Sequence, residues 1–194
     1  MKPLFAREEL IKRGVQIFTP LEFGSILNLP GYKTKYFLEK FTREGLLLRL
    51  KKGIYGLKTD LPSEEEIANR VYRPSYLSFE YALAYYNILP EMPYAVTSAT
   101  TKPTRTFTID SKTFSYFSIK KNAYTGYMLT KTEKKSFLIA EPEKALVDYL
   151  YFVAIGKKPF NDRLRTSSLN KAKLIKYATF YNRSRLDMLI KNLK

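Results

Sequence analysis

The segment from Thr19 to Leu57 constrains the fold of this chain more than any other part of the sequence. It starts with Thr-Pro-Leu-Glu at residues 19–22, where the threonine hydroxyl caps a helix, proline needs no amide partner and the glutamate completes a capping box. Asn-Leu-Pro-Gly at residues 28–31 then forces a turn, because proline disfavours helix at the preceding residue and glycine tolerates unusual backbone angles. This short helix is expected to face the protein core with Leu21, Ile26 and Leu27.

A second helix is expected from Tyr32 to Glu44, ended by Gly45. Its apolar residues form one stripe, and a polar stripe spaced three, four and three residues apart lies opposite. The apolar stripe consists of Phe37, Leu38 and Phe41, and the polar stripe of Lys33, Tyr36, Lys40 and Arg43, flanked by Lys35. Taken alone, such a pattern is also typical of an ordinary amphipathic helix with a solvated face.

A basic hairpin follows the second helix. Alternating apolar residues at 46–50 and 54–57 flank Lys51-Lys52-Gly53, which indicates two antiparallel strands joined by a doubly basic turn. Helix, turn, helix and hairpin in this order are the layout of a winged helix-turn-helix, in which the second helix enters the major groove of DNA.

This layout predicts a set of DNA contacts of two kinds. Side chains at the start of the second helix are expected to reach base edges or flanking phosphates, and later cations are expected to bind phosphates with little sequence information. The first kind consists of Lys33, Thr34, Lys35 and Tyr36, and the second of Lys40, Arg43, Arg49, Lys51 and Lys52.

The charge of the chain is concentrated at its two ends. The formal net charge is +16; residues 1–57 carry +6, residues 58–155 only +1, and residues 156–194 carry +9. So large and uneven an excess favours a polyanionic partner, although lysine-rich surfaces also serve solubility alone.

Composition excludes several classes of site. The chain has no cysteine and no histidine, so disulfides, thiolate metal sites and the Ser-His-Asp or Cys-His catalytic arrangements are impossible. There is no glycine-rich phosphate loop. Apolar runs fall short of the roughly 18 residues that span a membrane, and the charged start is unlike a secretory signal. A cytoplasmic, non-enzymatic protein with no cofactor, metal or membrane association is expected.

Residues 58–62 read as a linker, so two domains are expected, at 1–60 and 61–194. Leu4, Phe5, Leu10 and Ile11 are the apolar residues of an opening helix at 4–13. In the second domain the patterns predict α+β structure with a small antiparallel sheet and C-terminal helices. Expected helices are 63–71, 78–88, 141–155, 168–181 and 184–192; expected strands are 95–100, 104–109, 114–119 and 137–140, with 122–132 irregular or a weak strand.

Two polar segments of the second domain stand out. Residues 97–105 concentrate hydroxyls and two cations, which is typical of an edge strand with solvated side chains. Lys144 and Asp148, beside Glu143, can pair across one helical turn, an interaction worth a few tenths of a kcal/mol at a surface.

The second domain resembles the AbiEi-type antitoxins of bacterial type IV toxin–antitoxin, or abortive-infection, systems. The resemblance lies in four segments in this order: YLSFEYALAYY at 76–86, LPE at 89–91, VTSATTKPTR at 96–105 and AEPEKALVDYLY at 140–151. The motif residues that it marks are Thr97, Ser98, Thr101, Arg105, Glu143, Lys144 and Asp148.

The resemblance implies a two-domain protein. The amino-terminal domain would repress its own operon by binding inverted repeats in promoter DNA, and the carboxy-terminal domain would counteract a nucleotidyltransferase toxin, with or without a stable complex. Two other functions fit the same sequence. One is a ligand-responsive winged-helix regulator without a toxin. The other is a DNA-targeted nuclease built on carboxylates such as Asp110, Glu141 and Glu143.

Overall fold

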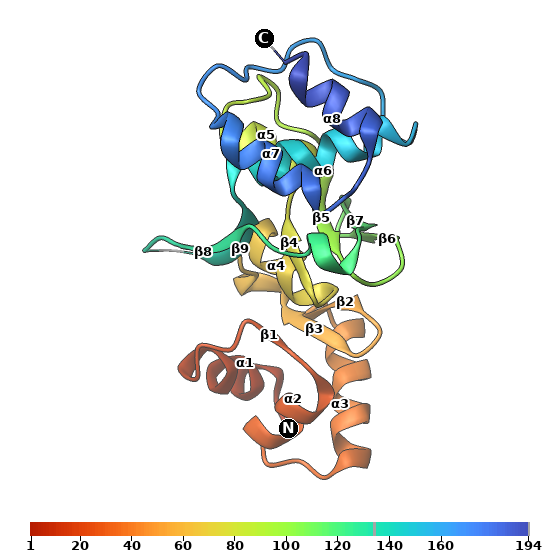
Figure 1. The fold of residues 1–194 in the computed structure, drawn as a ribbon. Helices are drawn as coiled ribbons and strands as arrows, with labels where there is room; N and C mark the ends of the chain where they lie inside the picture. Colours follow the sequence, from red (N-terminus) through yellow and green to blue (C-terminus); the bar gives the residue numbers. More distant parts are fainter. Residues whose placement is uncertain (134, 194) are drawn as a thin grey trace. The chain divides into compact units, whose positions relative to one another are not determined.

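A computed structural model describes residues 1–133 and 135–193 and confirms the α+β class (Figure 1). Over this described part the chain forms eight α-helices and two sheets, one of three strands and one of six. Backbone contacts divide it into two compact units, Met1–Val71 and a second unit that starts at Tyr72. The sequence placed the boundary between residues 60 and 61; where the chain separates into independently folding domains stays a prediction.

The first unit contains four α-helices and a three-stranded antiparallel sheet within its residues 1–71. Its elements are α1 (Pro3–Lys12), β1 (Ile17–Phe18), α2 (Pro20–Ile26), α3 (Gly31–Arg43), β2 (Leu47–Lys51), β3 (Ile54–Leu57), the 3-10 turn η1 (Lys58–Asp60) and α4 (Glu64–Val71). The strand order is β1-β3-β2, so the two-residue strand β1 pairs with the hairpin on the side away from β2.

The capping box at the start of α2 is confirmed. The Thr19 hydroxyl accepts from the Glu22 amide at 3.3 Å, and the Glu22 carboxylate accepts from the Thr19 amide at 2.6 Å. Both bonds satisfy amides that have no partner within the helix, so α2 starts where the sequence predicts.

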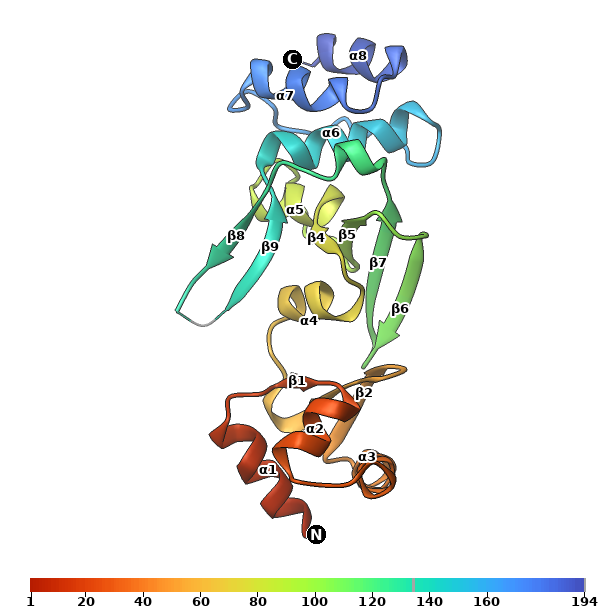
Figure 2. The ribbon, with the colours of Figure 1, turned by 60° about the horizontal axis from the view of Figure 1, so that its bottom comes forward.

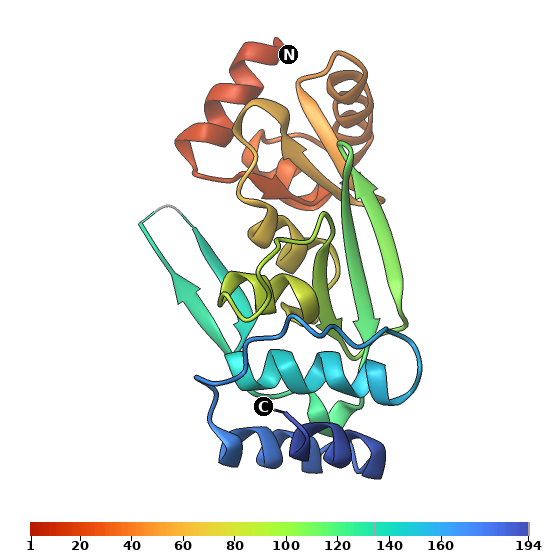
Figure 3. The same cartoon turned by 90° about the horizontal axis from the view of Figure 1, so that it is seen from above.

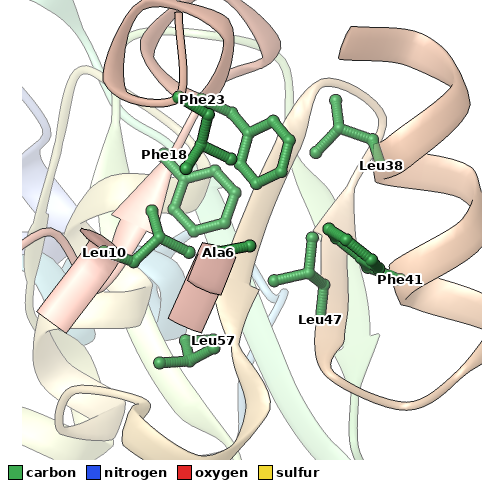
Figure 4. Close-up of a cluster of buried hydrophobic side chains, with 9 residues drawn as sticks. Ala6, Leu10, Phe18, Phe23, Leu38, Phe41, Leu47 and Leu57 are labelled. Atoms are coloured by element: carbon green, nitrogen blue, oxygen red, sulfur yellow. The ribbon is translucent and has the colours of Figure 1, made fainter. Parts of the chain in front are cut away.

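The core of the first unit forms where α3 meets the sheet and α2. Figure 4 shows Leu38 and Phe41 of α3 pointing toward Leu47 of β2, next to Phe18 and Phe23. Phe18 and Phe23 stack with ring centroids 5.4 Å apart. These contacts hold the apolar side of α3 against the domain and leave its other sides to solvent.

One residue expected to face this core lies outside it. Leu21 is 84% exposed, so that expectation was wrong. On α1 the core receives Ala6 and Leu10, whereas the apolar residues Leu4, Phe5 and Ile11 are exposed. Leu21 lies in the first turn of α2, where Phe23 is the core residue, and α1 buries only one narrow edge.

The second unit combines a six-stranded sheet with four α-helices among its described residues. Its strands are β4 (Ser75–Leu77), β5 (Val96–Thr100), β6 (Arg105–Ile109), β7 (Lys112–Ser118), β8 (Tyr127–Lys131) and β9 (Ser136–Ala140). Its helices are α5 (Phe79–Tyr85), α6 (Pro142–Ala154), α7 (Lys171–Thr179) and α8 (Ser184–Lys191), with a 3-10 turn η2 (Lys121–Ala123).

The sheet is mixed, which corrects the expected small antiparallel sheet. The order is β6-β7-β5-β4-β9-β8, with β4 parallel to β9 and β5 parallel to β7. Figure 2 shows the β6–β7 and β8–β9 hairpins at opposite edges. The central strand β4 has only three residues and was not predicted, because so short a segment carries no alternation to recognise.

Helix α6 lies between the sheet and the α7–α8 pair, as Figure 3 shows. It also contacts α5, so nearly all of its surface is covered, and eleven of its thirteen residues are buried. Within the described ranges 1–133 and 135–193, no helix combines the length and apolar character that crossing a membrane requires.

Candidate nucleic-acid interface

A groove of about 870 Å³ lies within the first unit, between α2, α3 and the β2–β3 hairpin. We call it the α3 groove. Its charged lining consists of Lys35 and Glu39 from α3, Arg49 from β2 and Lys52 from the hairpin turn, all of them exposed. Three cations and one carboxylate from two different elements therefore share one concave surface.

The floor of the α3 groove depends on a close approach of α2 and α3. A Cβ atom at Gly24 would lie 2.7 Å from the Thr34 hydroxyl oxygen, a distance that real Cβ atoms essentially never show. The Thr34 hydroxyl donates to the Pro30 carbonyl at 3.2 Å and is 3.4 Å from that of Leu29. Glycine in α2 thus admits Thr34, whose hydroxyl ties α3 to the turn before it.

The hairpin that forms the other wall is tight. Lys51 pairs with Ile54, so the connection consists of Lys52 and Gly53 alone. Gly53 has a φ of +79°, a conformation that side-chain-bearing residues rarely adopt. The turn therefore places Lys52 at the tip of the hairpin, where it lines the α3 groove.

The predicted DNA-contacting residues divide over two sides of α3. Lys35, Arg49 and Lys52 come together on the α3 groove. Around α3, a smaller depression of about 190 Å³ is lined by Tyr36, Lys40 and Arg43, and also by Glu39, which lines the α3 groove as well.

The remaining predicted residues occupy other environments. Lys33 is exposed, whereas Lys51 is partly buried, as is Lys40, whose ammonium lies 3.8 Å from the Glu44 carboxylate. Thr34 is only 6% exposed, which favours a structural role over contact with DNA. Glu39 was not singled out from the sequence; its place one turn after Lys35 was the available signal.

The motif residues of the second unit form a different kind of site, a buried polar cluster. We call it the Asp148 cluster; it consists of Asp148, Lys144, Tyr76, Ser78 and Tyr181. Asp148 and Lys144 form an ion pair with no exposed surface, where the sequence had indicated a surface pair. That expectation was wrong, because α7 and α8 cover the polar side of α6.

The Asp148 carboxylate accepts hydrogen bonds on both oxygens. Ser78 and Tyr76 donate to Oδ2 at 2.8 and 3.0 Å, and Tyr181 donates to Oδ1 at 2.5 Å. These donors come from β4, from the residue that precedes α5 and from the segment after α7, so one carboxylate ties three parts of the unit to α6.

Burial dominates the electrostatics of the Asp148 cluster. It lowers the pKa of the Lys144 ammonium, an effect that the neighbouring Asp148 carboxylate opposes. It also raises the pKa of Tyr76 and Tyr181 well above that of a free tyrosine, and the charge of Asp148 adds to this effect. Both phenols therefore stay protonated and serve as donors.

Other motif residues also make internal contacts. The Thr97 hydroxyl donates to the Ser78 carbonyl at 2.7 Å and accepts from the Tyr81 amide at 3.1 Å, so it caps α5 from a neighbouring strand. Glu143 accepts from the Asn170 amide at 3.1 Å at the start of α7. These residues hold elements of the second unit together.

The segment 97–105 is not the solvated edge strand expected from its composition. β5 lies inside the sheet and is buried along its whole length, Ser98 included, because β4 and β7 flank it. Thr101 is partly buried after the strand, and Arg105 is exposed at the start of β6. The structure therefore does not bring Thr97, Thr101 and Arg105 together on one open surface.

The carboxylates considered for nuclease chemistry are spread over the unit. Asp110 lies in the β6–β7 turn, whereas Glu141 and Glu143 lie at the start of α6. Across residues 1–133 and 135–193, no three His, Cys, Asp or Glu side chains are grouped to hold a metal ion.

Comparison with known proteins finds no family model and no curated protein that matches this chain.

Proposed function

We propose that this chain is a DNA-binding transcriptional regulator whose first unit acts as a winged helix-turn-helix. The observation that carries the proposal is the α3 groove, where Lys35, Arg49 and Lys52 from a helix and a hairpin line one concave surface. In a winged helix-turn-helix, the second helix lies in the major groove and the wing contacts the adjacent phosphate backbone. Cations on both the helix and the hairpin are what such contacts require.

The dimensions of α3 are consistent with this role. Its thirteen residues correspond to about 20 Å of helix at about 1.5 Å per residue, and the major groove, about 12 Å wide, admits an α-helix. Its core side, with Leu38 and Phe41, is fixed against the unit, so its exposed sides are presented in a defined orientation.

We further propose that the regulator is the antitoxin of a type IV toxin–antitoxin system and represses its own operon. The support is the resemblance of residues 76–151 to AbiEi-type antitoxins. Since Lys144, Asp148 and Thr97 are buried and satisfied inside the unit, their part in toxin neutralisation would be to maintain the fold. The residues that counteract the nucleotidyltransferase would then lie on other surfaces.

The DNA-binding proposal is tested by the salt dependence of binding to the chain's own promoter fragment. Changing Arg49 and Lys52 together to alanine is expected to lower the slope of log affinity against log salt by about 0.9 for each phosphate that is no longer neutralised. A matched control changes Lys121 and Lys131, two exposed lysines of the second unit, to alanine. An unchanged slope in the first variant would exclude the hairpin as a wing.

The antitoxin proposal expects the adjacent gene to encode a nucleotidyltransferase, and it is tested by co-expression of this chain with the product of that gene. The full chain is expected to restore growth, and so is the Arg49→Ala/Lys52→Ala variant, since the toxin-directed activity is assigned to the second unit. Loss of rescue in that variant, with normal folding, would place neutralisation in the DNA-binding unit. No rescue by the full chain would reject the antitoxin proposal and leave the DNA-binding proposal standing.

A further inference from the structure

Glu39 is the one acidic side chain in the lining of the α3 groove. It is exposed on α3, one turn after Lys35, and the other charged groups of the lining are the cations Lys35, Arg49 and Lys52. Among the residues that the structure describes, its carboxylate makes no ion pair and no hydrogen bond. A carboxylate without a partner among the described residues thus lines a groove whose other charged groups are cations, and it also borders the depression that holds Lys40 and Arg43.

A carboxylate in this place opposes binding to the phosphate backbone. Two like charges 4 Å apart repel by about 1 kcal/mol even in bulk water, and by more near a protein surface. If the α3 groove contacted phosphates alone, Glu39 would lower the affinity for DNA and would make no favourable contact in exchange. Its presence therefore points to a partner group that donates a hydrogen bond.

The major groove offers such donors only on certain bases. Cytosine presents its N4 amino group, and adenine presents its N6 amino group beside the N7 acceptor, whereas guanine and thymine present acceptors there. A carboxylate only accepts, so the adenine N7 repels its second oxygen. Cytosine is the base edge that suits a glutamate best.

Lys35 provides a second, neighbouring contact. Four residues along an α-helix correspond to about 6 Å, and base pairs in a duplex are stacked about 3.4 Å apart. Lys35 and Glu39 on one side of α3 thus reach base pairs one or two steps apart. Lysine suits the acceptors of guanine, so the two side chains have complementary preferences.

We propose that Glu39 is a specificity-determining residue that accepts a hydrogen bond from the N4 amino group of a cytosine in the bound duplex. The inference rests on the proposed DNA-binding function and deepens it. Glu39 selects sequence through this acceptor, while Arg49 and Lys52 supply affinity without sequence preference.

The test is selection of binding sites from a duplex library with a randomised central segment, using the full chain at low ionic strength. Wild type is compared with Glu39→Gln, Glu39→Ala and Glu8→Gln. Glu8 is an exposed glutamate on α1 outside the α3 groove, so its variant has the same change of charge and serves as the control. Selected positions are then measured singly with all four base pairs.

Wild type and Glu8→Gln are expected to select a site with cytosine preferred about tenfold at one position. Glu39→Gln is expected to change the preference at that position to adenine, because an amide pairs with both N6 and N7. Glu39→Ala is expected to lose the preference and to bind unrelated duplexes more tightly than wild type does.

Two results would overturn the inference, and they are distinguishable. If both Glu39 variants select the wild-type site with the same preference at every position, Glu39 does not read a base, and the DNA-binding proposal stands. If wild type is retained on no duplex at low ionic strength, the proposed function itself fails, and the inference fails with it.

Discussion

At the scale of single residues, Asp148 has four buried polar partners. Its carboxylate accepts from Tyr76, Ser78 and Tyr181 and pairs with Lys144. A fully buried ion pair contributes little net stability by itself, because desolvation offsets the attraction. The arrangement matters because removing one partner leaves the other charge buried and unpaired.

We predict that Asp148→Ala lowers the free energy of unfolding by about 3–5 kcal/mol. The uncompensated Lys144 ammonium and the unpaired tyrosine hydroxyls both contribute to this decrease. The measurement is urea denaturation followed by circular dichroism. The double variant Lys144→Met/Asp148→Leu, which removes both charges, is expected to be destabilised less; a larger destabilisation in the double variant would contradict this explanation.

Two glycines in left-handed conformations differ in what surrounds them. Gly126 has a φ of +72°, and a Cβ there would lie 2.6 Å from the Tyr177 ring, whereas Gly156 has a φ of +73° and an open surrounding. Tyr177 belongs to α7, so Gly126 permits the close packing of α7 against the segment before β8.

We therefore predict that Gly126→Ala destabilises the protein more than Gly156→Ala does. Both substitutions carry the same backbone penalty of about 1–2 kcal/mol, and only the first adds a steric clash with Tyr177. Thermal unfolding of the two variants measures the difference. Equal unfolding midpoints for the two variants would show that α7 shifts to accommodate the added methyl group with no loss of stability.

At the scale of elements, the capping box of α2 makes the stability of the fold depend on pH. The Thr19 amide donates to the Glu22 carboxylate and lowers its pKa below the ordinary 4.5, with further help from Arg70. A carboxylate whose pKa is lowered by folding stabilises the protein above its unfolded pKa and loses this contribution as pH falls through its folded pKa.

The prediction is that wild type loses its stability advantage over Glu22→Gln as the pH falls below about 4.5. Thr19→Ala keeps the carboxylate, so it is expected to be less stable by about 1 kcal/mol at neutral pH and still to lose stability on acidification. Unfolding free energies between pH 7 and pH 3 supply the comparison. Parallel curves for wild type and Glu22→Gln would refute the assignment.

Local sequence rules predicted most elements, and they did so where the signal lies within a few residues. Capping at Thr19, the turn before α3 and the hairpin all depend on neighbours in sequence, although the hairpin turn is one residue shorter than predicted because Lys51 pairs with Ile54 in the ladder. By contrast, β4 and the mixed order of the sheet depend on pairing between distant segments. No local pattern reports which strand lies beside which.

At the scale of the whole molecule, the first unit carries its own core and the entire α3 groove within residues 1–71. We predict that residues 1–71, produced alone, fold cooperatively and bind promoter duplex. Circular dichroism and retention on the duplex measure the two properties. An unfolded piece would show that the first unit needs the rest of the chain.

For the candidate site, too, some features could be predicted from local sequence and others depend on contacts between distant segments. Lys35, Arg49 and Lys52 were predicted because helix period and hairpin alternation identify exposed cations. The position of Glu39 beside these cations depends on the packing of α3 near the hairpin, which no local pattern reports. Burial of Thr34 likewise depends on Gly24, a residue from a different helix.

The sequence by itself determined where helices and turns begin and where the basic charge lies, because caps, glycines, prolines and side-chain period act over a few residues. Only the tertiary structure decided which side of each element is covered: Leu21 is exposed, whereas Lys144 and Asp148 are buried beneath α7 and α8. The physical reason is that burial depends on which elements pack together, and a charged pair can be buried when its partners satisfy it.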